Sequence, residues 1–444
     1  MFSYSHSLSY VYKLNRNRKV WLKFGFDRML NVLEKIGNPQ DSLKTIHIAG
    51  TKGKGSTLAF FSSILRQKFK VGSFTSPSLV NATERISIDG SLIPPHSFSL
   101  IVDRLKEIYS SIEEENVPST FETFTIISFI YFLEKQVDIA LYEVGLGGRL
   151  DATNIIRHPL VSIITEISYD HQKTLGNTLR EIATEKAGII KKGTPLVIAK
   201  QEKEALETIV NKARKKRIDY FEYGKDYFIT NVKEYEKGTI FDFHSPSLTK
   251  NFEKLFVPMM GKHQAENAAS AIQAALLLKE KGCNLDESDI RNGLSKTFWP
   301  GRLEIASKIP LIVLDGAHNK ASAEALAHLL MKVFDKKIVF LFSMLKDKNI
   351  EDTLSVLAPI GERFVLTEVP HSSSRRLTVD KLNHIAERYI SKDRIVVEKN
   401  PVRAFYTARR NIKEDELLCV TGSLYLVGYI RKLMNYFIFS KNLL

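Results

Sequence analysis

A glycine-rich loop stands between an apolar run and a helical pattern near the start of this chain. The loop reads AGTKGKGST, from Ala49 to Thr57. A β-branched run, LKTIHIAG, leads into it, and the segment STLAFFSSILRQKFK follows with apolar residues at helical spacing. Backbone N–H groups of such a loop and the positive end of the helix dipole together favour a bound anion such as a phosphate. The sequence therefore predicts a strand, a phosphate-binding loop and a helix.

The glycine spacing differs from the Walker A pattern, G-x-x-x-x-G-K-[ST]. Gly50 precedes Gly53 by three residues instead of five, and Gly55 separates Lys54 from the next serine. Lys54 can still reach the β- and γ-phosphates of a nucleotide, and Ser56 can face a phosphate or a metal ion. The alternative is a tight glycine turn beside a surface lysine.

Strand and helix patterns alternate in both halves of the chain. In the first half, strands are predicted at VGSFTSPS, VDIALYEVG and LVSIITEIS, with a helix at FTIISFIYFLEKQ. In the second half, strands are predicted at PLIVLDG, KIVFLFS, RFVLTEV, RIVVEK and LLCVTGS, with a helix at KASAEALAHLLMKVF. This alternation is typical of α/β proteins, in which crossover helices connect the strands of a parallel sheet.

At 444 residues, the chain is long enough for two domains. We expect an N-terminal phosphate-loop ATPase domain with a mostly parallel sheet over residues 1–298, and a C-terminal Rossmann-like α/β domain over 304–444. Residues 299–303, within FWPGRLE, hold a Pro-Gly turn and form the junction.

Composition narrows the range of partners. The net charge of +14 permits nucleic-acid binding, but the basic residues are dispersed apart from RNRK and ARKKR, which favours an ordinary lysine-rich surface. Cys283 and Cys419 lie far apart in the sequence, which fits a reducing cytosol. No apolar run reaches the roughly 18 residues that span a bilayer. We expect a cytoplasmic monomer that acts on small molecules and binds neither nucleic acid nor membrane.

The N-terminal segments YVYKLN and WLKFGFDRMLNVLEKIGNP read as parts of a folded domain rather than as a targeting signal.

Side chains suited to chemistry follow two of the predicted strands. Glu143 ends the run VDIALYE, where phosphate-loop enzymes hold Mg²⁺ with a Walker B acid. Asp170 and His171 follow the next strand, at the sheet edge where ligands of open α/β sheets gather. A solvated strand end and a structural histidine are the simpler alternatives. The GLGG segment does not complete a dinucleotide fingerprint, because Leu150 stands where a third glycine is needed.

Lys186 falls on the apolar stripe of a predicted helix, TLREIATEKAGIIKKG, together with Ile182 and Ile190. The pattern alone favours snorkelling, in which the stem packs and the ammonium group reaches water. The alternative is a lysine that serves chemistry or is modified to lose its charge.

Further polar residues lie at element ends in the second half. Asp315, His318 and Asn319 follow the strand in LIVLDGAHNK. Asn267 is near the start of a long helix that MMGKHQAENAASAIQAALLL opens, and Arg302 at the junction could close over a triphosphate. Capping and turn formation explain these residues equally well.

These motifs, in this order, resemble the folylpolyglutamate synthase/dihydrofolate synthase family of the Mur ligase superfamily. The phosphate loop of the family reads G-T-N-G-K-G-[ST], and this chain has GTKGKGS. The resemblance covers nearly the whole chain and continues through TSPSLVNATERI, FETFT, EVGLGGRLDATN, DHQKTLG, EKAGI, HQAENAASAI, PGRLE, DGAHN and TGSLYL. It implies the fold of the Mur ligase central domain for the N-terminal half.

The resemblance also implies an ATP-dependent amide ligase. ATP would phosphorylate the carboxylate of dihydropteroate or the γ-carboxylate of a folate, and the amino group of L-glutamate would attack the acyl phosphate. ADP, phosphate and a new amide would be released. The implied cofactors are ATP, two Mg²⁺ ions and a carbamylated lysine at Lys186.

The family motifs assign site residues by position. The residues implied to contact ATP are Thr51, Lys52, Gly53, Lys54, Gly55, Ser56, Asn267, Arg302 and Asp315. The implied Mg²⁺ ligands are Ser76, Glu143 and His171. The residues implied to act in catalysis are Lys54, Glu143, His171, Lys186 and His318. The implied pterin-side pocket consists of Phe121, Glu122, Thr123, Phe124, Leu150, Asp151 and Ala152.

Two positions depart from the family pattern. Lys52 replaces the usual Asn, which adds positive charge near the phosphates and should be tolerated. Ser78 replaces the His often found in SPHL, which leaves the substrate preference open.

Two other functions are compatible with parts of the sequence. A peptidoglycan Mur ligase is less favoured, because such enzymes carry an extra domain before the phosphate loop and only 49 residues precede Gly50 in this sequence. A phosphate-loop NTPase coupled to nucleic acid fits the charge, but no recognition motif supports it.

Overall fold

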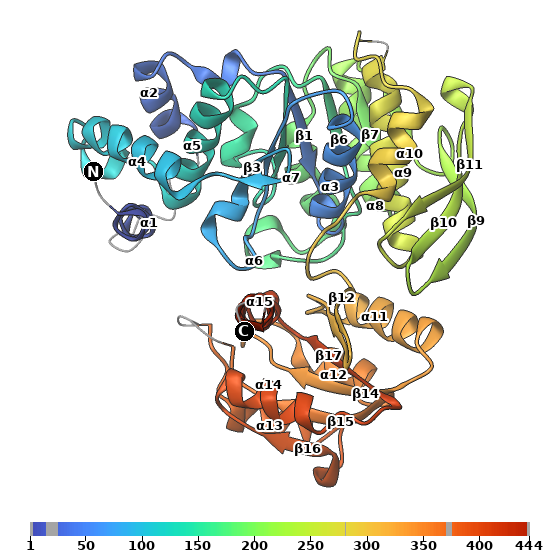
Figure 1. Ribbon diagram of the computed structural model, residues 1–444. Coiled ribbons are helices and arrows are strands. Elements are labelled where there is room, and N and C mark those ends of the chain that lie inside the picture. Colours follow the sequence, from blue (N-terminus) through green and yellow to red (C-terminus); the bar gives the residue numbers. More distant parts are fainter. Residues whose placement is uncertain (1–2, 15–24, 280, 370–374, 442–444) are drawn as a thin grey trace. The chain divides into compact units, whose positions relative to one another are not determined.

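The computed structural model describes residues 3–14, 25–279, 281–369 and 375–441 (Figure 1). These residues form two compact units. The first unit runs to Lys233 and also includes Thr239–Pro258 and Lys262–Thr297. The second unit consists of Glu234–Gly238, Met259–Gly261 and the chain from Phe298 onward. Both units are α/β structures, which confirms the predicted fold class.

An eight-stranded sheet forms the centre of the first unit, in the order β4-β3-β2-β5-β1-β6-β7-β8. Its strands are β1 (Thr45–Ala49), β2 (Val71–Phe74), β3 (Ile86–Ile88), β4 (Ser91–Leu92), β5 (Ile139–Glu143), β6 (Val161–Ile164), β7 (Leu196–Ile198) and β8 (Tyr220–Glu222). Six strands are parallel, and only β3 and β4 at one edge are antiparallel. The strand that precedes the glycine loop, β1, lies between β5 and β6.

Helices cover this sheet. They are α1 (Tyr4–Lys13), α2 (Asp27–Lys35), α3 (Lys54–Leu65), α4 (Pro95–Ser110), α5 (Thr120–Glu134), α6 (Gln172–Leu175), α7 (Leu179–Lys186), α8 (Lys203–Lys216), α9 (Lys262–Lys279) and α10 (Glu287–Ser295). Short 3₁₀ turns of this unit are η1 (Pro39–Asp41), η2 (Ala82–Arg85), η3 (Glu114–Asn116), η4 (Ala152–Ile155), η5 (Ala187–Ile189) and η6 (Pro246–Leu248), whereas η7 (Lys392–Arg394) belongs to the second unit. The folded segments expected near the N-terminus are present as α1 and α2, whereas residues 15–24 lie outside the described part.

Helix α3, which starts at the glycine loop, is buried along nearly its whole length. Helix α10 presses directly on it at Gly293, where an added Cβ atom would lie 2.4 Å from the Cα atom of Ile64. The hydroxyl of Ser63 also donates to the Gly293 carbonyl across 2.6 Å. The backbones of α3 and α10 are therefore locked together.

The helix predicted over TLREIATEKAGIIKKG is shorter than expected. Helix α7 begins after Thr178 and ends at Lys186. The side chain of Thr178 accepts a hydrogen bond from the Glu181 N–H and so caps the helix. The 3₁₀ turn η5 follows, and a Cβ atom at Gly188 would lie 2.3 Å from the Cα atom of Arg149. The prediction of a helix up to residue 193 is wrong because the chain turns to pack against the backbone of another loop.

A three-stranded sheet in the order β11-β10-β9 was missed by the sequence analysis. Its strands are β9 (Phe228–Tyr235), β10 (Gly238–Ser245) and β11 (Lys250–Val257). Alternate residues of β10 are buried, and Phe243 stacks on Phe252 with ring centroids 5.9 Å apart.

The second unit contains a six-stranded sheet in the order β12-β13-β17-β14-β15-β16. Its strands are β12 (Glu304–Lys308), β13 (Leu311–Leu314), β14 (Lys337–Phe342), β15 (Gly361–Leu366), β16 (Ile395–Val397) and β17 (Glu416–Thr421). Only β12, at one edge, is antiparallel to its neighbour. The helices are α11 (Lys320–Val333), α12 (Ile350–Leu357), α13 (Val379–Ala386), α14 (Pro401–Arg410) and α15 (Leu424–Lys441). This arrangement confirms the expected Rossmann-like unit.

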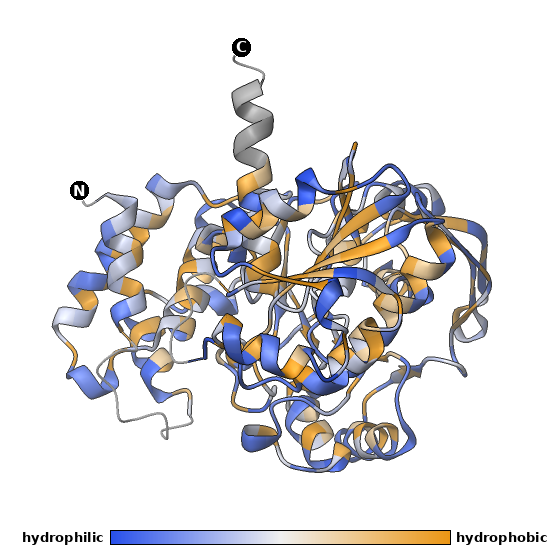
Figure 2. Ribbon diagram, turned by 90° about the horizontal axis from the view of Figure 1, so that it is seen from below, coloured by the Kyte–Doolittle hydropathy of each residue, from blue (hydrophilic) through white to orange (hydrophobic). Residues whose placement is uncertain are grey.

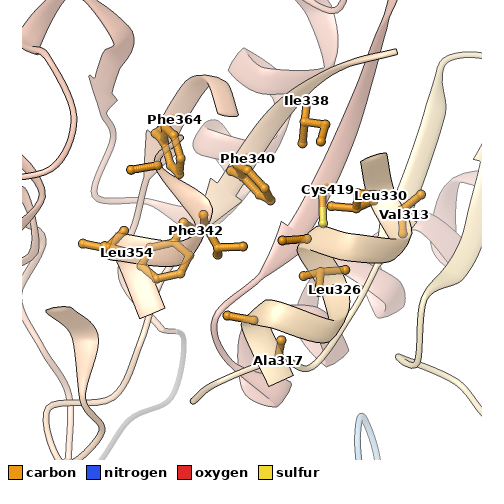
Figure 3. Close-up of a cluster of buried hydrophobic side chains, with 14 of the residues drawn as sticks. Val313, Ala317, Leu326, Leu330, Ile338, Phe340, Phe342, Leu354, Phe364 and Cys419 are labelled. Carbon is orange, nitrogen blue, oxygen red and sulfur yellow. The ribbon is translucent and has the colours of Figure 1, made fainter. Parts of the chain in front are cut away.

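Aromatic and aliphatic side chains fill one face of this second sheet (Figure 3). Phe340 of β14 stacks on Phe364 of β15 with ring centroids 5.0 Å apart. Leu354 from α12 and Leu330 from α11 belong to the same buried cluster. The unit thus has a hydrophobic core of its own.

Hydrophobic residues are concentrated on the strands and on parts of the helices, while many loops are hydrophilic (Figure 2). In the described part of the chain, no helix combines the length and the apolar character needed to cross a membrane.

Candidate active site

The glycine loop lies at the carboxyl end of β1 and leads directly into α3. Gly53 has a φ of 82° and precedes the first helical residue, Lys54. An added Cβ atom at Gly53 would lie 2.2 Å from Oδ1 of Asn267, which belongs to α9. Only glycine meets both the conformation and the close approach. The structure therefore places Asn267 against the predicted phosphate loop.

Backbone hydrogen bonds fix the first half of the loop to the segment after β6. The N–H groups of Thr51 and Lys52 donate to the carbonyl of Glu166, across 2.9 and 3.0 Å. Oγ1 of Thr51 is 3.2 Å from both N and O of Ser168. The hydroxyl of Thr51 thus ties the glycine loop to Ser168 and stabilises the conformation of the loop.

The two lysines of the loop point at different partners. Nζ of Lys54 donates to the carbonyl of Gly50 across 3.1 Å, so this side chain curls over the loop. Nζ of Lys52 instead lies 2.8 Å from Oε1 of Glu166, in a partly exposed ion pair. Gly55 and Ser56 occupy the first turn of α3, where backbone N–H groups have no earlier carbonyl within the helix.

Glu143 and Ser76 meet at the carboxyl ends of the neighbouring strands β5 and β2. The Glu143 side chain is buried, and its Oε2 accepts a hydrogen bond from the Ser76 N–H across 3.0 Å. Carboxylate and hydroxyl oxygens are ligands that Mg²⁺ prefers, and Mg²⁺ usually completes its shell with phosphate oxygens and water. These two residues therefore fit a Mg²⁺ ion beside a bound nucleotide.

His171 is the third predicted metal ligand, and its surroundings differ. Its side chain is about half exposed, and Nε2 lies 3.8 Å from Oδ2 of Asp170. Imidazole is a less typical ligand for Mg²⁺ than an oxygen donor. Within the described residues, no group of three or more His, Cys, Asp and Glu side chains is arranged to hold a metal ion.

Lys186 is buried rather than snorkelling, so the interpretation that the pattern alone favoured is wrong. Only 5% of the residue is exposed, and Nζ donates to the carbonyl of Gly50 across 2.9 Å. Burial, and then the nearby charge of Lys54, lower the pKa of Lys186 to about 7, while Asp170 and Asp151 oppose the shift. At neutral pH a large fraction of this amine is unprotonated, which is the form that reacts with CO₂. The residue therefore fits carbamylation.

Asp151 organises the loop between β5 and η4. Its Oδ1 accepts hydrogen bonds from N and Oγ1 of Thr153, across 3.0 and 2.6 Å, and Oδ2 accepts from the Leu146 N–H across 2.9 Å. Burial raises the pKa of Asp151, and these hydrogen bonds counteract the rise. Its neighbours Leu150 and Ala152 are half-buried and buried, respectively. Asp151 thus caps η4 and also lies close enough to influence Lys186.

The segment from Phe121 to Phe124 lies near the start of helix α5, and three of its four residues are buried. Glu122 accepts from the Ser119 N–H across 2.6 Å and pairs with Arg28 across 3.1 Å. Thr123 is hydrogen-bonded to another side chain in the core, the Tyr109 hydroxyl, across 3.1 Å.

Phe124 and Phe121 differ in their surroundings. Phe124 is fully buried, with the Phe98 ring 5.8 Å away and the guanidinium of Arg85 over its face. Phe121 is half-buried, and its ring occupies the space that a Cβ atom at Gly145 would need. Phe121 is therefore the member of this segment that meets the loop carrying Asp151.

Two predicted nucleotide contacts, Arg302 and Asp315, and the predicted catalytic residue His318 belong to the second unit. Asp315, directly after β13, accepts hydrogen bonds from the N–H groups of Leu303 and Ala317, both across 2.8 Å. Burial raises its pKa, and the charge of Arg302 opposes the rise. Nδ1 of His318 donates to the Gly316 carbonyl across 2.7 Å. Asp315 shapes this turn, as the capping alternative anticipated.

His47, in the middle of β1, is a buried polar residue that was not predicted as part of the site. Its side chain is fully buried, and Nε2 lies 2.8 Å from Oγ1 of Thr153. Burial lowers the pKa of His47 to about 3. The available signal was a lone imidazole inside an otherwise apolar, β-branched run.

Comparison with known proteins covers both units. Residues 48–275 match the family described as Mur ligase middle domain, and residues 303–433 match the dihydrofolate synthetase C-terminal domain. The dihydrofolate synthase/folylpolyglutamate synthase of Bacillus subtilis is 36% identical over 422 residues, which cover 93% of this chain and 96% of that protein.

Solved structures give the same relationship. The crystal structure of the Thermotoga maritima folylpolyglutamate synthase matches with a TM-score of 0.85 and 36% identity, over 97% of this chain and 96% of that chain. The Mycobacterium tuberculosis folylpolyglutamate synthase, solved with ADP and AMPPCP, matches with a TM-score of 0.87 and 30% identity, over 97% and 99% of the two chains.

Proposed function

This chain belongs to the dihydrofolate synthase/folylpolyglutamate synthase family, and we propose that it joins L-glutamate to dihydropteroate or to a reduced folate in an ATP-dependent reaction. Members of this family are ATP-dependent carboxylate–amine ligases of folate metabolism. The main support for the proposal is that two lysine amines bind the same backbone oxygen of the phosphate loop. Lys54 and Lys186 both donate to the carbonyl of Gly50, at the start of the phosphate loop.

The reaction needs a substrate carboxylate to become an electrophile. Its oxygen attacks the γ-phosphorus of ATP, the bond to the β-phosphate oxygen breaks, and ADP leaves. The amino group of glutamate then attacks the acyl phosphate, phosphate leaves, and the nitrogen loses a proton as the amide forms. Backbone N–H groups of the loop and the Lys54 ammonium stabilise charge on the transferring phosphoryl group.

Negative charge on both reactants opposes the first step. A Mg²⁺ ion held by Glu143 and Ser76, with His171 as the third protein ligand that the family motif assigns, would supply compensating charge at the phosphates. We propose two such ions, as the resemblance implies. Glu143 suits this role because it is a buried carboxylate beside the strand that carries the loop.

Lys186 is the proposed site of carbamylation. Addition of CO₂ to its neutral amine, with release of one proton from the nitrogen, would place an anion close to the loop where the protonated lysine would place a cation. The low pKa and the burial of this amine support the assignment.

The remaining nucleotide and substrate contacts follow from the family motifs. For ATP we propose Thr51, Lys52, Gly53, Gly55, Ser56 and Asn267 in the first unit, and Arg302 and Asp315 in the second. We propose His318 as a catalytic residue near the phosphates. For the pterin side we propose Phe121, Glu122, Thr123, Phe124, Leu150, Asp151 and Ala152. We further propose that residues 1–298 bind ATP and folate, that residues 304–444 form the glutamate-ligase domain, and that the enzyme is a cytoplasmic monomer without a nucleic-acid partner.

A ligation assay tests this function. The purified chain, ATP, Mg²⁺ and L-glutamate are incubated in parallel with dihydropteroate and with tetrahydrofolate, and phosphate and the new amide are measured. We expect phosphate release that requires both glutamate and a pteridine substrate and that DNA or RNA does not stimulate. Phosphate release that depends on nucleic acid instead would overturn the proposal.

A further inference from the structure

A buried chain of hydrogen bonds joins the strand that carries the phosphate loop to the loop that carries Asp151. Nε2 of His47, in β1, lies 2.8 Å from Oγ1 of Thr153, and Oγ1 of Thr153 donates to Oδ1 of Asp151 across 2.6 Å. His47 and Thr153 are fully buried, and Asp151 is 6% exposed. The chain therefore runs through the protein interior, away from competing water.

The direction of the protons follows from the number of donors. The Asp151 carboxylate accepts from the N–H groups of Thr153 and Leu146 as well as from the Thr153 hydroxyl, so it acts as an acceptor only. A threonine hydroxyl has a single proton, and here Asp151 receives it. Oγ1 of Thr153 must therefore accept from His47, and Nε2 of His47 must carry a hydrogen.

The other ring nitrogen leads to the same tautomer. Nδ1 of His47 is buried, and it has no hydrogen-bond partner among the residues that the structure describes. A hydrogen on Nδ1 would be a buried donor without an acceptor, which is more costly than a bare lone pair. A positive charge on the ring is also disfavoured, because burial and the nearby ammonium of Lys191 both lower the pKa of His47.

We propose that His47 is a positioning residue for the pteridine side of the reaction. As a neutral Nε2–H tautomer, it commits the Thr153 hydroxyl proton to Asp151 and holds that carboxylate, and with it the turn from Leu146 to Asp151, in one orientation. The proposal rests on the proposed function, which assigns Asp151 to that side. Gly50 follows His47 by three residues. The strand β1 would therefore orient both the phosphate loop and the turn that carries Asp151.

Nuclear magnetic resonance of the full-length protein, labelled with ¹⁵N in its histidine rings, tests the tautomer without any substrate. The signals that disappear in His47→Gln belong to His47. We expect a neutral Nε2–H pattern that does not titrate from pH 5.5 to 8, that shifts in Thr153→Val and that persists in Thr153→Ser. An imidazolium or an Nδ1–H tautomer would overturn the proposal.

Kinetics test the positioning role. Thr153→Val and His47→Leu remove the hydrogen bonds and should raise KM for the pteridine substrate about fivefold, while KM for ATP stays within about twofold. Thr153→Ser keeps the hydroxyl and His47→Gln keeps an N–H donor near the Nε2 position, so both should restore the wild-type ratio of the two KM values. A lower melting temperature with an unchanged ratio in Thr153→Val would contradict the role.

The proposed function and the positioning role can fail separately. Wild-type protein that fails to ligate glutamate would overturn the proposed function, and the resonance experiment would still decide the hydrogen-bond chain.

Discussion

Nζ of Lys186 lies 2.9 Å from the carbonyl oxygen of Gly50, so the last residue of α7 is bound to the first glycine of the phosphate loop. This contact puts a buried amine with a pKa of about 7 beside the site where phosphates are proposed to bind. Since a protonated amine does not react with CO₂, we expect the carbamylated fraction of Lys186, at a fixed concentration of dissolved CO₂, to increase as the pH rises through about 7.

Chemical trapping of the carbamate, followed by peptide mass analysis, measures this fraction. Lys191 is a matched control, because burial lowers its pKa to about 8 but its Nζ donates to the Asn154 carbonyl instead. Equal labelling of the two lysines would show that low pKa alone explains the reaction. Lys186→Ala should lose ligation and regain part of it with short carboxylic acids, and wild-type activity in that variant would rule out an essential carbamate.

Lys54→Ala and Glu143→Gln should abolish ligation while leaving the fold intact. Removing a donor that stabilises a transferring phosphoryl group reduces turnover by about 100-fold or more. In Glu143→Gln the amide oxygen can still accept from the Ser76 N–H, so this hydrogen bond is kept while the negative charge is lost. Phosphate release and thermal melting measure the two properties, and full activity in either variant would contradict the site assignment.

Gly53→Ala should weaken ATP binding as well as stability. Gly193 provides the matched control, since its φ of 75° is similar but nothing lies within 4 Å of an added Cβ atom. We expect Gly193→Ala to lower the free energy of unfolding by about 1–2 kcal/mol through the left-handed backbone alone. Gly53→Ala should cost about 1–3 kcal/mol more through the clash with Asn267, and should raise KM for ATP. Equal behaviour of the two variants, in denaturant melts and in KM, would exclude a specific role for the contact.

The pair between Lys52 and Glu166 should contribute little to stability. The two side chains are 33% and 46% exposed, and such pairs are worth about 0–1 kcal/mol. A double-mutant cycle with Lys52→Asn and Glu166→Gln should give a coupling free energy in that range, and it should shrink as salt is added. A coupling above about 2 kcal/mol that resists salt would show that the pair is a structural requirement of the loop.

The elements that the sequence predicted correctly are those with buried strands and strong local signals. The β1–loop–α3 unit was predictable because a β-branched run, a cluster of glycines and a helical pattern follow one another. The β9–β11 sheet was missed because its strands are partly exposed and their apolar alternation is weak outside β10. The end of α7 was misplaced because it depends on the contact of Gly188 with Arg149, which lies far away in the sequence.

Some properties of the candidate site could not be read from residue types at all. Whether Lys186 snorkels or is buried depends on what packs above it, and the helical stripe is compatible with both. The role of His47 depends on a hydroxyl 106 positions later in the chain. Motif order identified the family, whereas proton positions and pKa values required the packed structure.

The close contact at Gly293 has a consequence for natural variation. Because an added methyl group would press on the backbone of α3 near Ile64, a substitution there must displace the helix that begins at the phosphate loop. Position 293 is far from the phosphate loop in the sequence, and distance along the chain alone would suggest that a substitution there has little effect on the enzyme. A carrier of alanine at this position should instead show a heat-sensitive enzyme whose defect disappears on cooling.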